Sequence, residues 1–135
     1  MTLFLDACIV VYWIEARDPF HARLMGMLRA LRRESPEAMF AVSRLSVLEC
    51  LVQPLRDGDA DMIDAYRDFF DAGQLQVVEL TAAVVDRATT LRASHGLKTP
   101  DALQAASALE LPGDVLFLTN DRRFARVPGL RLRLP

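Results

Sequence analysis

The strongest constraint on the fold is a pair of short apolar segments, each followed closely by an acidic residue. Residues 3–5 (LFL) lead directly into Asp6, and residues 114–118, which contain the run VLFL, end shortly before Asp121. A strand that is apolar at every position is buried on both faces, as in parallel sheets that helices cover on either side. We therefore expect a parallel sheet with acidic side chains beyond the ends of its strands.

Strand-like and helical patterns alternate along the rest of the chain. Apolar residues at helical spacing predict helices at residues 9–15, 21–33, 43–55, 59–72, 82–95 and 101–110, and a short helix ending near residue 124. Further strands are expected at residues 38–42, 76–80 and 130–134, the last with the Leu–Arg alternation of a half-exposed edge strand. This order predicts one α/β domain over residues 1–135, a three-layer α/β/α sandwich with a mostly parallel sheet of about five strands.

Several residues mark where the helices should begin or end. We expect Pro54 to help end the helix that starts at residue 43, and Thr81 to cap the helix at 82–95. Thr99, followed by Pro100, should cap the helix after that one.

Composition places the chain among ordinary globular proteins. Hydrophobic residues make up 52% of the 135 residues and charged residues 25%. No apolar run approaches the ~20 residues of a membrane-spanning helix, and Asp6 interrupts the apolar N-terminus, so neither a membrane span nor a signal peptide is predicted. Cys8 and Cys50 lie among apolar neighbours without a metal-binding motif, so we expect buried free thiols. These features predict a cytoplasmic protein.

The charge balance argues against a generic, charge-driven nucleic-acid binder. The net charge is -2, whereas such proteins usually carry a clear basic excess. Lys98 is the only lysine among 16 basic residues. Because arginine favours bidentate contacts to phosphate and carboxylate, a local basic rim around an acidic centre is one explanation of this bias, and a genomic preference for arginine is the other.

Two more acids are expected at the edge that Asp6 and Asp121 occupy. Asp101 lies in a first helical turn, and Glu49 lies at the border of an apolar stripe on its helix. That stripe consists of Leu45, Leu48, Val52 and Leu55. Helices that follow parallel strands begin at the carboxyl edge of the sheet, where ligands bind in such folds. The four carboxylates are therefore predicted to converge in one pocket.

Each of these acids also has a purely structural explanation. Asp101 in a first turn is favoured by the helix dipole, Asp121 can cap a helix, and Glu49 can simply be solvated. Asp6 can also act as a cap, but solvation explains poorly a carboxylate that directly follows a fully apolar strand. Taken together, the four positions favour a functional cluster over four separate structural roles.

A cluster of carboxylates requires neutralisation. Two like charges ~4 Å apart repel by about 4 kcal/mol at an effective dielectric near 20, so protons or cations must compensate them. Mg²⁺ and Mn²⁺ prefer oxygen ligands and keep several waters, which suits a pocket that also admits a phosphate. Such an ion can activate water and stabilise the leaving oxygen of a phosphodiester.

The acids occur within four segments in a particular order: FLDACIVVYWIE, SVLE, LKTPDALQAASA and FLTNDRRF. Over residues 3–124, this succession resembles the PIN-domain ribonucleases, and among them the toxins of VapBC toxin–antitoxin pairs. The resemblance implies that the metal-site acids are Asp6, Glu49, Asp101 and Asp121, with Thr119 and Asn120 as polar helpers. Ala7 departs from the pattern, because relatives often carry a small hydroxyl or amide residue there, and this puts a secondary hydrogen bond in doubt.

The resemblance also implies an activity and partners. The expected activity is endonucleolytic cleavage of RNA with Mg²⁺ or Mn²⁺, inhibited by a cognate VapB-like antitoxin, in a protein that forms a homodimer. A PIN-like scaffold that binds RNA or protein without cutting is the alternative. The presence of all four acids counts against that alternative.

Other site patterns fit poorly. Asp57, Asp59, Asp61 and Asp68 match positions of a calcium-binding loop, but Met62 stands where that loop requires glycine, and the segment has helical spacing. The chain also lacks the paired acids of a phosphorelay receiver and the second aspartate of a haloacid-dehalogenase-like phosphatase.

Overall fold

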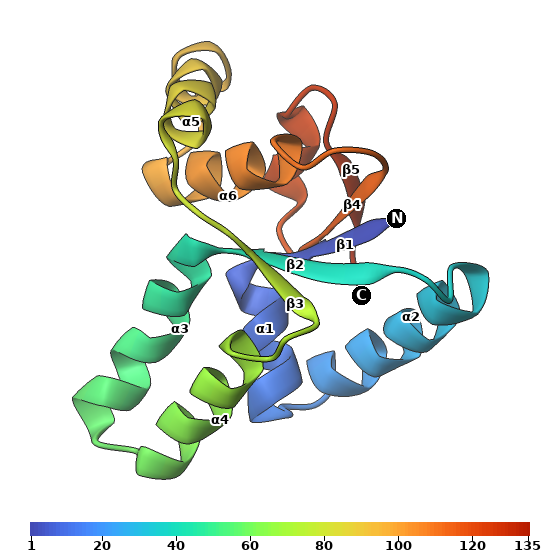
Figure 1. Ribbon diagram of the computed structural model, residues 1–135, viewed down its shortest axis with the longest axis vertical. Coiled ribbons are helices and arrows are strands. Elements are labelled where there is room, and N and C mark those ends of the chain that lie inside the picture. Colours follow the sequence, from blue (N-terminus) through green and yellow to red (C-terminus); the bar gives the residue numbers. More distant parts are fainter.

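The computed structural model describes residues 1–135 as a five-stranded, all-parallel sheet with the strand order β3-β2-β1-β4-β5 (Figure 1). The strands are β1 (Thr2–Leu5), β2 (Met39–Ser43), β3 (Leu75–Val78), β4 (Val115–Leu118) and β5 (Arg131–Arg133). The predicted α/β class and five-stranded sheet are confirmed. The edge strand β5 is parallel like the others, so no strand runs against the sheet.

Six α-helices and one 3₁₀ helix cover the two faces of this sheet. They are α1 (Ala7–Glu15), α2 (Phe20–Glu34), α3 (Arg44–Asp57), α4 (Ala60–Phe70), α5 (Ala82–His95), α6 (Thr99–Leu109) and η1 (Arg122–Arg126). In Figure 1, α1 to α4 lie on one side of the sheet, and α5 and α6 lie on the other. None of these helices has the length and apolar character needed to cross a membrane.

The alternation of side chains along the strands divides the core into two layers. Leu3 and Leu5 of β1 point to the face covered by α1 to α4, whereas Phe4 points to the face covered by α5 and α6. All three side chains are almost completely buried. The apolar strand therefore has a core on each side, as its sequence predicts.

Two expectations about α3, its core-facing stripe and its end at Pro54, are wrong. Its apolar stripe does not face the core, because Leu48 is 61% exposed and Leu55 is 53% exposed. The buried positions are Ser46, Cys50, Leu51 and Pro54. Pro54 does not end the helix, since only one hydrogen bond is lost at its missing N–H. The helix continues to Asp57, and Gly58 then adopts the left-handed conformation with a φ of 62°.

Of the two expected helix caps at the starts of α5 and α6, one is present and the other is not. Thr81 caps α5 by accepting a hydrogen bond from the Val84 N–H at 3.3 Å, as predicted. Thr99 is not the cap of α6, because that position belongs to Lys98. The Thr99 hydroxyl instead accepts a hydrogen bond of 2.7 Å from Arg92, which ties α6 to the end of α5.

The segment that partly matched a calcium-binding loop is helical. Asp59 caps α4 through a 3.2 Å bond from the Met62 N–H, and residues 60–70 form the helix itself. The two cysteines are free thiols, as expected; Cys50 is buried and Cys8 is half-buried.

Phe117 is expected to be a large contributor to stability. It is fully buried between Phe4 and Phe124, with ring centroids 5.4 and 4.8 Å away. Phe117→Ala leaves a cavity that these rings cannot fill, so the free energy of unfolding should fall by about 3–5 kcal/mol. Urea denaturation measures this change, and Met39→Ala, at a 56% exposed position, should change it by less than about 1 kcal/mol.

Candidate functional site

The register of the three central strands brings chemically active residues to one edge of the sheet. Leu5, the last residue of β1, lies opposite Val42 of β2 and Leu118 of β4. The residues that follow these strand ends therefore share one level, and Asp6 and Thr119 meet there. The Asp6 N–H also donates to the Leu118 carbonyl at 3.0 Å, which continues the ladder past the strand.

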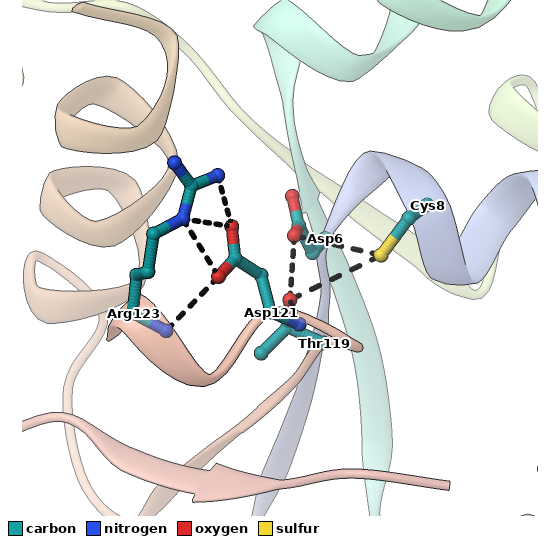
Figure 2. A network of polar contacts seen from close by, with 5 residues as sticks. All are labelled: Asp6, Cys8, Thr119, Asp121 and Arg123. Atoms are coloured by element: carbon teal, nitrogen blue, oxygen red, sulfur yellow. Dashed lines mark hydrogen bonds and ion pairs between the residues drawn. The ribbon is translucent and has the colours of Figure 1, made fainter. Parts of the chain in front are cut away.

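The Asp6 carboxylate is held by several donors but has no cationic partner. The Thr119 hydroxyl donates to its Oδ2 at 2.7 Å (Figure 2). The Ala7 N–H donates to its Oδ1 at 2.8 Å. Burial raises the pKa of Asp6 from 3.8 to about 6, although these hydrogen bonds lower it. The negative charge of Glu49 raises this pKa further, so the two carboxylates interact.

Thr119 connects the two acids that follow the strands. Its buried hydroxyl donates to Asp6 and accepts a 3.1 Å bond from the Asp121 N–H. The Cys8 sulfur lies 3.6 Å from Asp6 Oδ2 and 3.9 Å from the Thr119 hydroxyl oxygen. Burial, together with the negative charge of Asp6, raises the pKa of Cys8 to about 12, so this thiol is neutral.

Asp121 differs from Asp6 in having a cationic partner. The Arg123 guanidinium contacts both carboxylate oxygens, with a shortest distance of 2.6 Å, and the Arg123 N–H donates to Oδ1 at 2.9 Å (Figure 2). These bonds lower the pKa of Asp121. The pKa of Asp101 is raised, mainly by burial; Arg123 lowers it and Asp121 raises it, so the three charges form one group.

Glu49 is attached to the site through a neighbour on another helix. The Gln104 amide nitrogen on α6 donates to Glu49 Oε1 at 3.0 Å and to the Ser46 hydroxyl oxygen at 2.9 Å. Glu49 and Ser46 both lie on α3, so this amide bridges the two helices beneath the acids.

Asp6 and Asp121 line one open pocket whose other walls carry basic and aromatic groups. These walls are formed by Cys8, Tyr12, Arg23, Asn120, Arg122, Arg123, Leu134 and Pro135. Asn120 donates a 3.1 Å hydrogen bond to the Tyr12 hydroxyl, which fixes the rim next to Asp6. Glu49 and Asp101 are not among the lining residues of this pocket.

The four sequence-predicted acids thus form two interacting pairs, Asp6 with Glu49 and Asp101 with Asp121. No three His, Cys, Asp or Glu side chains lie together at metal-binding distance. The donor set nevertheless fits a hard divalent cation in chemical type, because it consists of carboxylates and a hydroxyl, and the half-buried Asp6 carboxylate has no cationic partner. The structural roles also exist, since Asp6 caps α1 and Asp121 caps η1.

The sequence-based reasoning missed Gln104 and Arg123. Gln104 is 2% exposed and stands between alanines and leucine on the buried face of α6. A polar residue within such an apolar stretch, one turn after Asp101, is a signal that could have identified it. Arg123 gave no such signal, because its neighbours include several other arginines.

Comparisons with known proteins identify the family and the fold of the chain. The family described as PIN domain matches residues 3–130 of the chain. No curated protein matches the sequence. Similar solved structures include VapBC2 from Rickettsia felis bound to a DNA fragment from its promoter, at 21% identity and a TM-score of 0.76, covering 99% of this chain and 98% of that one.

Two further structures show the same fold. A toxin–antitoxin complex from Klebsiella pneumoniae is 21% identical with a TM-score of 0.70, and the match covers 96% of this chain and 95% of the other. VapBC-1 from nontypeable Haemophilus influenzae is 18% identical with a TM-score of 0.70, covering 98% and 97%.

The buried charge of Asp6 should make the metal-free protein less stable as the pH rises from about 4 to about 6. The folded state binds the Asp6 proton more tightly than the unfolded chain, since its pKa is raised from 3.8 to about 6. The resulting decrease in the free energy of unfolding is at most about 3 kcal/mol, and it is complete above the pKa of Asp6 in the folded state. Asp6→Asn keeps an oxygen that can cap α1 but carries no charge, so the free energy of unfolding of this variant should not show the decrease that Asp6 causes.

The measurement is urea unfolding of both proteins in chelator at pH 4 and pH 7. The variant should gain stability relative to the wild type between these pH values. Asp64→Asn, on the exposed face of α4, serves as the control and should follow the wild type. A difference between Asp6→Asn and the wild type that is the same at both pH values would contradict the assigned cause.

Proposed function

The chain belongs to the PIN-domain family, and we propose that it is an endoribonuclease that cuts RNA phosphodiester bonds with Mg²⁺ or Mn²⁺. The observation that carries this proposal is the half-buried Asp6 carboxylate at the carboxyl edge of the sheet, which forms no ion pair with any side chain. Maintaining such a charge costs stability, and a bound cation removes that cost.

In this proposal the ion is held by the four carboxylates of Asp6, Glu49, Asp101 and Asp121. When bound, it supplies activated water and stabilises charge on the leaving oxygen. The Thr119 hydroxyl fixes the orientation of Asp6 through its 2.7 Å bond. Asp121 has Arg123 on both oxygens, so its carboxylate has to share or exchange that partner in order to act as a ligand.

The walls of the pocket support a polyanionic substrate. Arg23 and Arg122 line the pocket beside Asp6 and take part in none of the ion pairs of the structure. Free guanidinium groups bind phosphate oxygens bidentately. A net charge of -2 is compatible with this role, because the positive charge needed for RNA is local to the rim.

The alternative is a PIN-like scaffold that binds RNA or protein without cutting it. The presence of all four acids, with Asp6 half-buried and without a cationic partner, favours the enzyme over the scaffold. A cleavage assay on purified protein, with and without divalent metal, separates the two.

We expect an antitoxin to bind this chain, because similar structures were solved as toxin–antitoxin complexes. An apolar hollow between α2 and α4 supports such a partner. It is lined by Trp13, Met25, Leu28, Phe40, Phe69, Leu75 and other residues, including three arginines. Those arginines, Arg29, Arg32 and Arg33, form no ion pair, so an apolar helix with acidic residues along one side fits this surface.

A homodimer is supported by a second surface. The exposed apolar residues Leu48 and Leu55 of α3 lie with Leu80 along one groove that contains no acidic residue. Large exposed aliphatic side chains that cluster in this way commonly mark a protein interface. A second copy of the chain is the proposed partner for this face.

Removing a metal-site acid should abolish RNA cleavage without unfolding the protein. Asp6→Asn and Asp101→Asn each remove one anionic ligand and relieve repulsion, so cleavage should fall by at least roughly 100-fold while metal-free stability is kept or raised. Activity is measured on RNA with Mg²⁺ and with Mn²⁺, and the fold by circular dichroism. Asp64→Asn should cleave like the wild type; near-normal cleavage by either site variant would refute the metal-site assignment.

Inhibition by the cognate antitoxin should compete with metal. A partner arginine or lysine that enters the acidic pocket neutralises the carboxylates where the ion would otherwise bind. Titration of Mn²⁺ into the isolated pair should therefore reduce inhibition, and so should changing the inserted basic residue to alanine. Inhibition that is unchanged in both experiments would mean that the partner acts elsewhere, for instance by blocking the RNA path.

A further inference from the structure

Gln104 occupies an unusual position for a neutral amide. Its side chain is 2% exposed on a face of α6 that otherwise consists of alanines and Ser107. The amide nitrogen makes two hydrogen bonds, to the Glu49 Oε1 at 3.0 Å and to the Ser46 hydroxyl oxygen at 2.9 Å. Both bonds cross from α6 to α3, between residues more than 50 positions apart in the sequence.

The charge of Glu49 determines which way this amide points. A carboxylate only accepts hydrogen bonds, so the nitrogen of Gln104, and not the oxygen, must face Glu49. The second N–H is then used by Ser46. As a result the amide oxygen Oε1 is directed into the core, where it is buried and has no hydrogen-bond partner.

This unpaired oxygen indicates that Gln104 does not serve stability. A buried acceptor without a donor is destabilising, and a methionine or leucine would fill the same space among the alanines without that cost. The contribution of the amide must lie in what its nitrogen does, and the nitrogen holds Glu49 together with the buried Ser46 hydroxyl on the same helix.

Glu49 needs a hydrogen bond of this kind if its carboxylate is to stay in one place. It lies on an exposed turn of α3, and its side chain has three rotatable bonds. Asp6, by contrast, is fixed by the strand end and by two short hydrogen bonds. The hydrogen bond from Gln104 is the only hydrogen bond or ion pair that restrains the Glu49 carboxylate.

We propose that Gln104 is a positioning residue that holds the Glu49 carboxylate in place to bind metal together with Asp6. The proposal rests on the metal-dependent function proposed above. Gln104 does not touch the ion in this arrangement; it acts through Glu49. Hydrogen-bond partners of metal ligands typically change metal affinity by about 10–100-fold when they are removed.

The test measures Mn²⁺ binding by calorimetry for the wild type, Gln104→Met, Glu49→Gln and the double variant. Gln104→Met should weaken Mn²⁺ binding by about tenfold. In the Glu49→Gln background the same substitution should have no further effect, because the carboxylate that it positions is gone. Equal binding by wild type and Gln104→Met, or an equal loss in both backgrounds, would overturn the proposal.

Gln53→Met is the matched control. Gln53 also donates its amide nitrogen to a carboxylate, Asp57, at 2.9 Å, but on the exposed end of α3. This variant should bind Mn²⁺ like the wild type. Urea unfolding without metal should show Gln104→Met to be no less stable than the wild type, which separates loss of positioning from loss of fold; Gln104→Leu repeats the test if the methionine variant does not fold.

Failure of the proposed function gives a different result from failure of this inference. If the wild type binds no Mn²⁺, the metal-dependent function is wrong, and with it the metal-positioning role. The unfolding data then still test the contact between the two side chains. If the effects of Gln104→Met and Glu49→Gln on the urea midpoint simply add in the double variant, the two side chains are not coupled.

Discussion

The site depends on the pairing of β1 with a parallel partner on each side. Because Leu5 is level with both Val42 and Leu118, the chain leaves three adjacent strands at one height. This places Asp6 beside Thr119, whose hydroxyl donates to the Asp6 carboxylate at 2.7 Å. A slip of the β1–β4 register by one residue would turn the strand faces over and separate Asp6 from the Thr119 hydroxyl. The register of β1 against β4 therefore positions the polar groups as well as the core.

The same register creates an electrostatic cost. Asp6 follows a strand with a core on either side, so its carboxylate is largely removed from water, and its pKa is raised to about 6 despite two short hydrogen bonds. Asp121, two residues further beyond its strand, is more exposed and is compensated by Arg123. Distance from the strand end thus decides which acid keeps an unbalanced charge. A fold selected for stability alone would not require an ionisable group at position 6.

The sequence predicted the elements well, because they follow from local patterns, whereas the metal-site role of the four acids stays a prediction. Apolar runs, helical spacing and the Thr81 cap depend on neighbours in the chain. The errors concern contacts between distant segments. The stripe with Leu48 and Leu55 looks like a core face, yet α3 turns Cys50 and Leu51 to the sheet. Thr99 looks like a cap, but Arg92 of the preceding helix takes its hydroxyl. Neither choice can be read from spacing alone, since each depends on which helix packs next to which.

The four acids are also fixed in two different ways. Asp6 is held by backbone register and by Thr119, which the sheet itself places. Glu49 and Asp121 are held by the side chains of Gln104 and Arg123, which belong to separate helices. In such a ligand set Asp6 is rigid, whereas Glu49 and Asp121 depend on side-chain contacts that can exchange. The set can close around a small cation, and it can equally accept a guanidinium at Asp121, as Arg123 demonstrates. If the proposed function is right, metal binding and inhibition by an inserted basic residue would be two ways of neutralising the same charges, and an arrangement that binds the ion would also make the site susceptible to a cationic inhibitor.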